Sequence, residues 1–115
     1  MSKILIILND PPYGTERSYN GLRLAKSLSN ADAQVTVFLM ADAVACAKSG
    51  QKVPQGFYNT ELMLNGVIRK GEVLLCGTCM DARGLTDDET IEGAKRSTMQ
   101  ELTECTLAAD KVLVF

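Results

Sequence analysis

KILIIL, at Lys3–Leu8, is an uninterrupted apolar run after its first residue. Such a run is typical of a strand that is covered on both faces, as in a parallel sheet, and we expect it to be the central strand. Residues 9–14 then form a loop, because Pro11, Pro12 and Gly14 interrupt regular structure. The chain therefore opens with a strand that leads into a loop.

Strands and helical segments alternate along the rest of the chain. Thr15 can cap a helix whose apolar face carries Leu22, Ala25 and Leu28. The remaining segments are a strand over 35–40, a short helix over 43–48, a helix over 60–70, a strand over 73–75, a helical turn over 87–92, a helix over 98–109 and a strand over 111–115. This alternation predicts a three-layer α/β/α sandwich with a mostly parallel sheet of four or five strands. The 115 residues are expected to form a single domain, residues 1–115.

The balance of charge excludes whole classes of partner. Twelve basic and fourteen acidic residues give a net charge of −2 without a long basic run, so we expect no nucleic acid partner.

The longest apolar run is too short to cross a bilayer and residues 1–3 lack a secretory leader, so we expect no membrane partner and a cytoplasmic location. In that compartment the four cysteines are expected to be reduced.

The chemistry centres on LLCGTCMDARG at residues 74–84, where an apolar run stops at Cys76 and is followed three residues later by Cys79. The pattern predicts a strand that delivers a thiol pair into a loop. The sequence contains no histidine, so most nucleophile–base pairs and mixed histidine metal sites are excluded. Thiol chemistry is therefore the leading candidate, and we expect no cofactor and no metal.

Three loops are expected to meet at one edge of the sheet. In open α/β sheets ligands gather at the carboxyl ends of the strands, and the loops over 9–14, 41–42 and 76–84 each follow a strand. If the first strand is central and the other two are its neighbours, the loops form one cleft. Its candidate catalytic and binding residues are Asn9, Tyr13, Asp42, Cys76, Cys79 and Arg83.

A reactive cysteine needs a feature that lowers the pKa of its thiol. Arg83 could supply a positive charge, and Gly77 and Gly84 would let backbone N–H groups approach the sulfur. A persulfide, whose terminal sulfur is anionic near neutral pH, would be held by the same features.

Plainer interpretations of these residues stay open. Cys76 could be a buried core residue, because free cysteine is among the most buried residue types. By the same reasoning Arg83 could be a solvated surface charge and Asp42 a helix cap. Tyr13 could be a packing residue at a turn, and Asn9 a turn former.

Three other functions are less well supported. A zinc site would need Cys46 and Cys105 as a second pair, although both fall singly within predicted helices. Disulfide oxidoreduction remains an alternative, although a thioredoxin-like motif normally opens a long helix after an early strand. Nucleotide or flavin binding is disfavoured, because the first loop lacks both G-x-G-x-x-G and a Walker lysine.

Six stretches of the sequence, taken together, resemble one family. They are NDPPYG at 9–14, LRLA at 22–25, FLMADAV at 38–44, GQK at 50–52, LCGTCMDARG at 75–84 and ADKVLVF at 109–115. In order and spacing they resemble the DsrE/DsrF-like family, especially its YchN-like branch, nearly end to end. The resemblance implies a small α/β sandwich that assembles into trimers or hexamers. It also implies a cysteine that carries sulfur as a persulfide between partner proteins.

The resemblance distinguishes between the two cysteines. In such sulfur carriers the cysteine ends a strand, and a glycine preceded by arginine follows eight residues later. Cys76 fits this spacing to Arg83 and Gly84 better than Cys79 does. The leading hypothesis is thus a small cytoplasmic sulfur carrier or sulfurtransferase with donor and acceptor proteins, in which Cys76 accepts sulfane sulfur and Cys79 is the resolving thiol. The alternative is a non-catalytic oligomeric module that binds a ligand or partner in the same cleft, with structural thiols.

Overall fold

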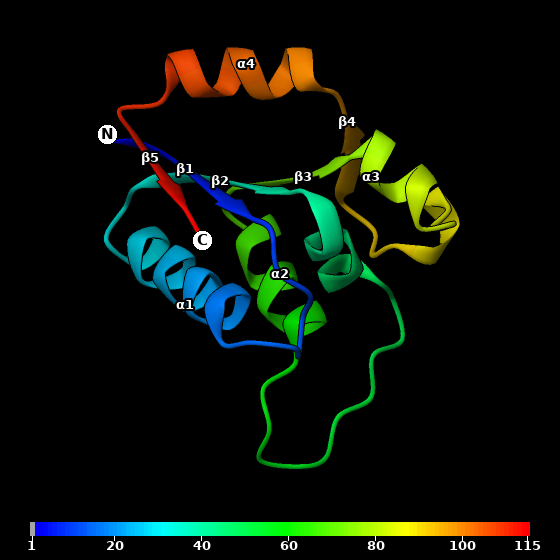
Figure 1. The fold of residues 1–115 in the computed structure, drawn as a ribbon. Helices are drawn as coiled ribbons and strands as arrows, with labels where there is room; N and C mark the ends of the chain where they lie inside the picture. The colour runs from blue at the N-terminus through cyan, green and yellow to red at the C-terminus, as the bar shows by residue number, and fades with distance from the viewer. Residues whose placement is uncertain (1) are drawn as a thin grey trace.

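One five-stranded sheet organises the chain. In the computed structural model, which describes residues 2–115, all strand pairs are parallel and the strand order is β4-β3-β2-β1-β5 (Figure 1). The strands are β1 (Lys3–Leu8), β2 (Gln34–Leu39), β3 (Glu72–Cys76), β4 (Ala94–Ser97) and β5 (Lys111–Val114). The predicted α/β architecture with a parallel sheet is confirmed.

Helices cover the two faces of the sheet unequally. The longer elements α1 (Arg17–Asn30) and α2 (Thr60–Ile68) pack on one face, and α4 (Met99–Ala108) lies alone across the other (Figure 1). Three short helical segments complete the fold, the 3-10 helices η1 (Ala41–Ala47) and η2 (Asp87–Glu89) and the α-helix α3 (Gly77–Ala82). None of the helices within residues 2–115 has the length and apolar character needed to cross a membrane.

The core follows from the alternation of side chains along the strands. Ile4, Ile6 and Leu8 of β1 point into the larger cluster, which packs under α1, α2 and η1. Leu5 points the other way, into a smaller cluster with Leu102 of α4. Because β1 contributes buried side chains to both faces, its sequence reads as a continuous apolar run rather than an alternating one.

Two expectations about the sheet were wrong. The first strand is not the central one, because β2 lies in the middle, with β1 on one side of it and β3 on the other. The strand β4 was not expected at all, since its sequence AKRS has no apolar pattern. As an edge strand it needs pairing on one side only, and its backbone follows β3 in register, with Leu75 opposite Arg96 and Cys76 opposite Ser97.

The predicted helices agree with the structure apart from local differences. The first begins at Arg17, whose N–H donates to Thr15 Oγ1 at 3.3 Å. The segment expected over 43–48 is a 3-10 helix that begins earlier, at Ala41. The side chains of Asn59 and Thr98 cap the N-termini of α2 and α4. Each accepts a hydrogen bond from the backbone N–H of the residue three positions later in the sequence.

Candidate functional site

The two cysteines lie at the junction between β3 and α3. Cys76 is the last residue of β3, and Cys79 lies in the first turn of α3, which begins at Gly77. Both thiols are free and partly exposed. Cys76 ends its strand as expected, whereas the expectation that Cys79 lies in a loop was wrong. The chain can turn directly into a helix here because Met80, fully buried, anchors α3 to the larger core cluster.

Arg96 of β4 holds α3 in place. Its guanidinium donates to the carbonyl oxygen of Gly77 at 3.1 Å and to Asp81 Oδ1 at 2.5 Å, both through Nη2. Through Nη1 it also donates to Asp87 Oδ1 at 3.3 Å. The approach of β4 favours glycine at position 77, because a Cβ there would lie 3.0 Å from Arg96 Nε and 3.2 Å from the carbonyl oxygen of Ser97. Arg96 was not identified from the sequence, since the strand that carries it was missed.

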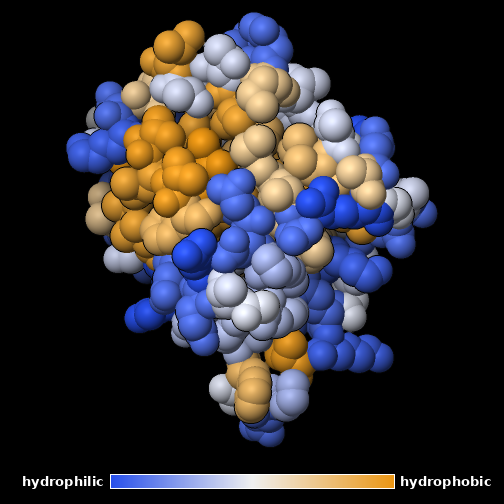
Figure 2. All heavy atoms as spheres, viewed as in Figure 1, coloured by the Kyte–Doolittle hydropathy of each residue, from blue (hydrophilic) through white to orange (hydrophobic). Residues whose placement is uncertain are grey.

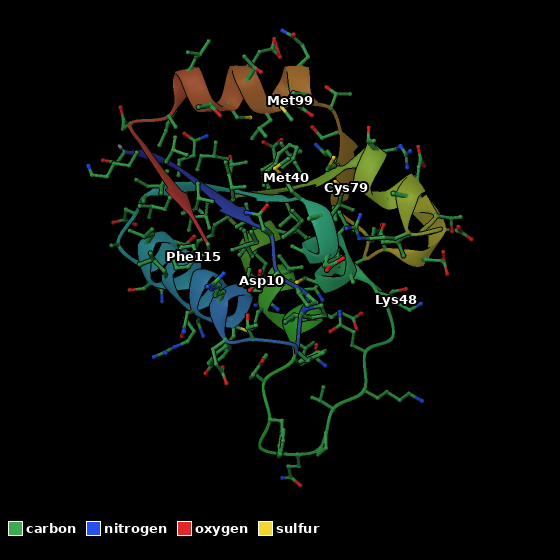
Figure 3. All side chains as sticks on the ribbon, in the orientation of Figure 1. Asp10, Met40, Lys48, Cys79, Met99 and Phe115 are labelled. Carbon is green, nitrogen blue, oxygen red and sulfur yellow. The ribbon has the colours of Figure 1, made fainter. Side chains whose placement is uncertain are left out.

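The sulfur of Cys79 has a backbone partner from the neighbouring strand end. The N–H of Ala41, the residue that begins η1, donates to Cys79 Sγ at 3.1 Å. Ala41 has a φ of +49°, a conformation uncommon for a residue with a side chain. Figure 3 shows Cys79 beside Met40, where the chain leaves β2. The carboxyl ends of β2 and β3 therefore meet at the thiol pair, as parallel neighbours should.

The surroundings of Cys76 favour the protonated thiol. Burial raises its pKa above the ordinary value, and the Cys79 side chain adds to this increase. The backbone of Cys79 and Thr78 has the opposite effect and lowers the pKa, without reversing the increase. The Cys76 side chain makes no hydrogen bond to the first turn of α3, and the expected net decrease in its pKa is not found.

Arg83 serves a different purpose from the one expected. Its Nε lies 2.8 Å from Asp42 Oδ1 in an ion pair, and its Nη1 donates to the carbonyl oxygen of Cys79 at 3.1 Å. Arg83 is not among the groups that shift the pKa of Cys76. The guanidinium thus ties η1 to α3 instead of lowering that pKa. Gly84, with a φ of +65°, ends this turn in a conformation that favours glycine.

Two predicted site residues have partners in other parts of the fold. Asn9 donates through Nδ2 to the carbonyl oxygen of Phe115 at 3.2 Å, so it joins β1 to the end of β5. The hydroxyl of Tyr13 donates to Gln51 and accepts from the Thr60 N–H at 3.2 Å, where α2 begins. The structure therefore brings together Cys76, Cys79, Asp42, Arg83 and Gly84, whereas Asn9 and Tyr13 have structural contacts elsewhere.

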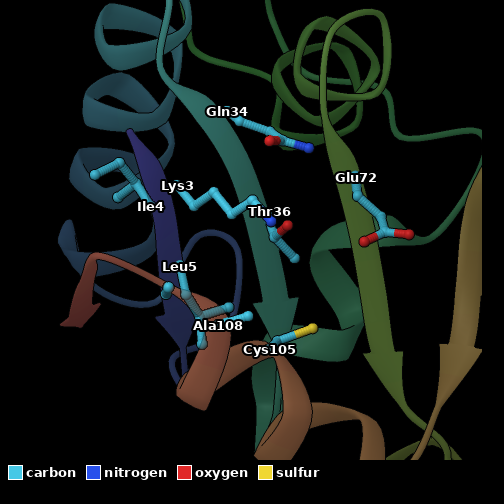
Figure 4. A pocket seen from close by; sticks show the side chains of 9 residues that line it. Lys3, Ile4, Leu5, Gln34, Thr36, Glu72, Cys105 and Ala108 are labelled. Carbon is cyan, nitrogen blue, oxygen red and sulfur yellow. The ribbon is translucent and has the colours of Figure 1, made fainter. Parts of the chain in front are cut away.

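The other two cysteines offer no comparable chemistry. Cys46 is fully buried, and burial raises the pKa of its thiol to about 12. Cys105 lines a cavity of about 190 Å³ between the sheet and α4 (Figure 4), where burial, followed by the charges of Glu72, Glu101 and Glu104, raises its pKa. Cys46 and Cys105 belong to core clusters on opposite faces of the sheet, so they do not come together as a second pair of zinc ligands. Within residues 2–115 no group of three or more potential side-chain ligands could hold a metal ion.

Comparisons with known proteins agree with this architecture. The chain is 42% identical to protein YchN of Escherichia coli over the whole length of both chains. It is 35% identical to an uncharacterized protein of Methanocaldococcus jannaschii, over 98% of this chain and 99% of that one. The crystal structure of YchN superposes with a TM-score of 0.94 and covers both chains completely.

A more distant structure shows how widely the fold is shared. A protein of unknown function from Methanobacterium thermoautotrophicum matches with a TM-score of 0.73 at 12% identity, covering 98% of this chain and 99% of that one. The model of the DsrE/DsrF-like family matches residues 2–115. The chain belongs to the DsrE/DsrF-like family.

Proposed function

We propose that this protein is a small cytoplasmic sulfur carrier that holds sulfane sulfur as a persulfide on Cys76. One observation carries the proposal: two partly exposed, reduced thiols lie three residues apart at the end of β3, and the backbone N–H of Ala41 donates to Cys79 Sγ. Backbone N–H donors stabilise a sulfur anion without requiring a cation or a cofactor. Membership of the DsrE/DsrF-like family supports the same role.

The first step is a transfer of sulfane sulfur from a donor persulfide. The Cys76 thiolate attacks the terminal sulfur of the donor, a new S–S bond forms on Cys76, and the donor leaves as a thiolate with the electron pair of the broken S–S bond. The thiol proton of Cys76 passes to solvent. The raised pKa of Cys76 keeps the resting thiol protonated, whereas the terminal sulfur of the persulfide is anionic near neutral pH. The same N–H donors therefore stabilise the loaded state more than the resting state.

The second step uses Cys79 as the resolving thiol. Its thiolate attacks the inner sulfur of the Cys76 persulfide, forms the Cys76–Cys79 disulfide and expels hydrosulfide with the electron pair. A dithiol reductant then supplies two electrons and two protons to restore both thiols. When an acceptor protein is present, its thiolate takes the terminal sulfur directly and Cys76 returns to the thiol. Asp42, Arg83 and Gly84 hold α3 and η1 together around this exchange.

The transfer of sulfur predicts a mass change confined to one residue. Incubation of the reduced protein with an organic persulfide should add one sulfur atom, detected by intact mass spectrometry and located by peptide mapping on Cys76. Cys76→Ser should abolish the addition, and Cys79→Ser should keep it for longer because the resolving thiol is gone. Cys105→Ser is the matched control, since Cys105 is also partly exposed. Equal loading of the Cys76→Ser variant would contradict the assignment.

The direction of the pKa shift predicts how Cys76 is alkylated. Because its pKa lies above the ordinary thiol value, Cys76 should react with iodoacetamide more slowly than a free thiol at neutral pH. Its rate should rise about tenfold per pH unit and continue to rise above the pH at which a free thiol levels off. The measurement is site-resolved alkylation in the Cys79→Ser background as well as in the native protein. A rate that is already constant at neutral pH would show a lowered pKa instead.

A second candidate function is a non-catalytic module that binds a ligand or partner at the same junction. The raised pKa of Cys76 favours it, because an inert thiol can be purely structural. The two functions differ in one respect. Only the carrier gains a sulfur atom on Cys76 when a sulfane sulfur donor is supplied.

We also propose that the protein is a homo-oligomer, a trimer or hexamer, assembled through the face of β1 and β5. Val112 and Val114 of the edge strand are 38% and 64% exposed, and they point to the same side as Leu5 and Ile7. Figure 2 shows a broad hydrophobic area over this part of the molecule. A second copy of the chain would cover both the apolar face and the unpaired edge.

If the chains assemble in this way, the mass of the oligomer in solution depends on the edge strand β5. Sedimentation analysis of the native protein should give three or six chains, and Val114→Lys should shift the population to smaller species. Leu62→Lys serves as the control, because Leu62 is 66% exposed but belongs to α2 on the opposite face of the sheet. A monomeric native protein at micromolar concentration would contradict the proposal.

A further inference from the structure

A groove of about 780 Å³ lies between α1, α2 and the connection that precedes α2. It is separate from the thiol pair, since none of its lining residues belongs to η1, β3 or α3. Its walls come from the two helices that pack on the same face of the sheet in Figure 1. The groove has the size of a small-molecule site.

The charge of this groove is opposite to that of the whole chain. Four of the twelve basic residues line it, Arg23 and Lys26 from α1 and Arg69 and Lys70 at the end of α2, and no lining residue is acidic. Within residues 2–115 none of the four forms an ion pair with a carboxylate. Four uncompensated cations on a chain of net charge −2 produce a local positive potential that favours an anion.

Aromatic and apolar side chains form the other part of the groove. Tyr19 and Tyr58 are stacked with ring centroids 4.1 Å apart, and the guanidinium of Arg23 lies 5.5 Å from the Tyr19 centroid. Phe57 and Leu62, both lining residues, are 71% and 66% exposed. The exposed ring of Phe57 offers a flat apolar surface beside the cations.

We propose that this groove binds an organic phosphate with a flat aromatic body, such as a mononucleotide. A phosphate monoester carries a charge of about −1.5 to −2 at neutral pH, which matches several cations better than a single carboxylate would. Its ring would pack on Phe57, and its oxygens would accept from Arg69 and Lys70. This site requires neither a glycine-rich loop nor a Walker lysine, because helix side chains supply the charge in place of backbone N–H groups.

The test compares three ligands on the full chain by calorimetric titration. Adenosine monophosphate should bind saturably with a Kd below about 1 mM. Glycerol phosphate, which lacks the ring, and adenosine, which lacks the phosphate, should each bind at least about tenfold more weakly. Equal binding of glycerol phosphate would overturn the aromatic half of the proposal, and equal binding of adenosine the electrostatic half.

Three variants locate the site. Arg69→Gln should weaken binding of adenosine monophosphate about tenfold, whereas Lys95→Gln, which removes an exposed cation outside the groove, should leave it unchanged. Ser29→Ala should leave binding unchanged, because the Ser29 hydroxyl is buried and out of reach of a ligand in the groove. The absence of saturable binding, or equal effects of Arg69→Gln and Lys95→Gln, would overturn the proposal.

Discussion

The guanidinium of Arg96 is the constraint on which the thiol site depends. It joins β4 to α3 and η2, because its N–H groups donate to the carbonyl oxygen of Gly77 and to the carboxylates of Asp81 and Asp87. The position of Cys76 follows from the buried strand β3, but the position of Cys79 depends on the direction in which α3 leaves the sheet. Because α3 has only six residues, its own hydrogen bonds cannot maintain it, and side-chain contacts at both ends must do so.

The electrostatics of the junction rest on backbone groups more than on charged side chains. The Arg83–Asp42 pair is largely solvent-exposed, and such pairs contribute about 0–1 kcal/mol to stability. The N–H of Ala41 is instead held by the backbone where the chain leaves β2, and it donates to Cys79 Sγ at 3.1 Å. Such an arrangement suits a site that changes from a neutral thiol to an anionic persulfide, because no side chain has to rearrange between the two states.

The sequence predicted the parts of the fold that depend on local apolar pattern. The strands β1, β2, β3 and β5 and the longer helices carry apolar runs or stripes, and all were found close to their expected positions. Strand β4 could not be found in this way, because an edge strand of sequence AKRS is defined by its pairing with β3 and not by its own composition. The order of the strands is likewise a property of the whole sheet.

The candidate site was predictable to a similar extent. The spacing of the cysteines identified the pair, and the topological rule for parallel sheets brought Asp42 and Arg83 to it. Asn9 and Tyr13 instead contact Phe115, Gln51 and Thr60, because that rule fixes the edge of the sheet but not the partners of each side chain. The raised pKa of Cys76 was also missed. It depends mainly on the burial of the sulfur where α3 begins at Gly77, and no capping side chain indicates that a helix begins there.

Amide hydrogen exchange of the Arg96→Gln variant tests most directly whether one guanidinium positions the thiol pair. The reporting amides are those of residues 80–85, including Leu85, whose N–H donates to the carbonyl oxygen of Met80 at 3.0 Å. Loss of the guanidinium should make exchange at these amides faster in Arg96→Gln, with Lys95→Gln matching the native protein and with unchanged exchange in β1 and β2. Unchanged exchange across residues 80–85 in Arg96→Gln would contradict it.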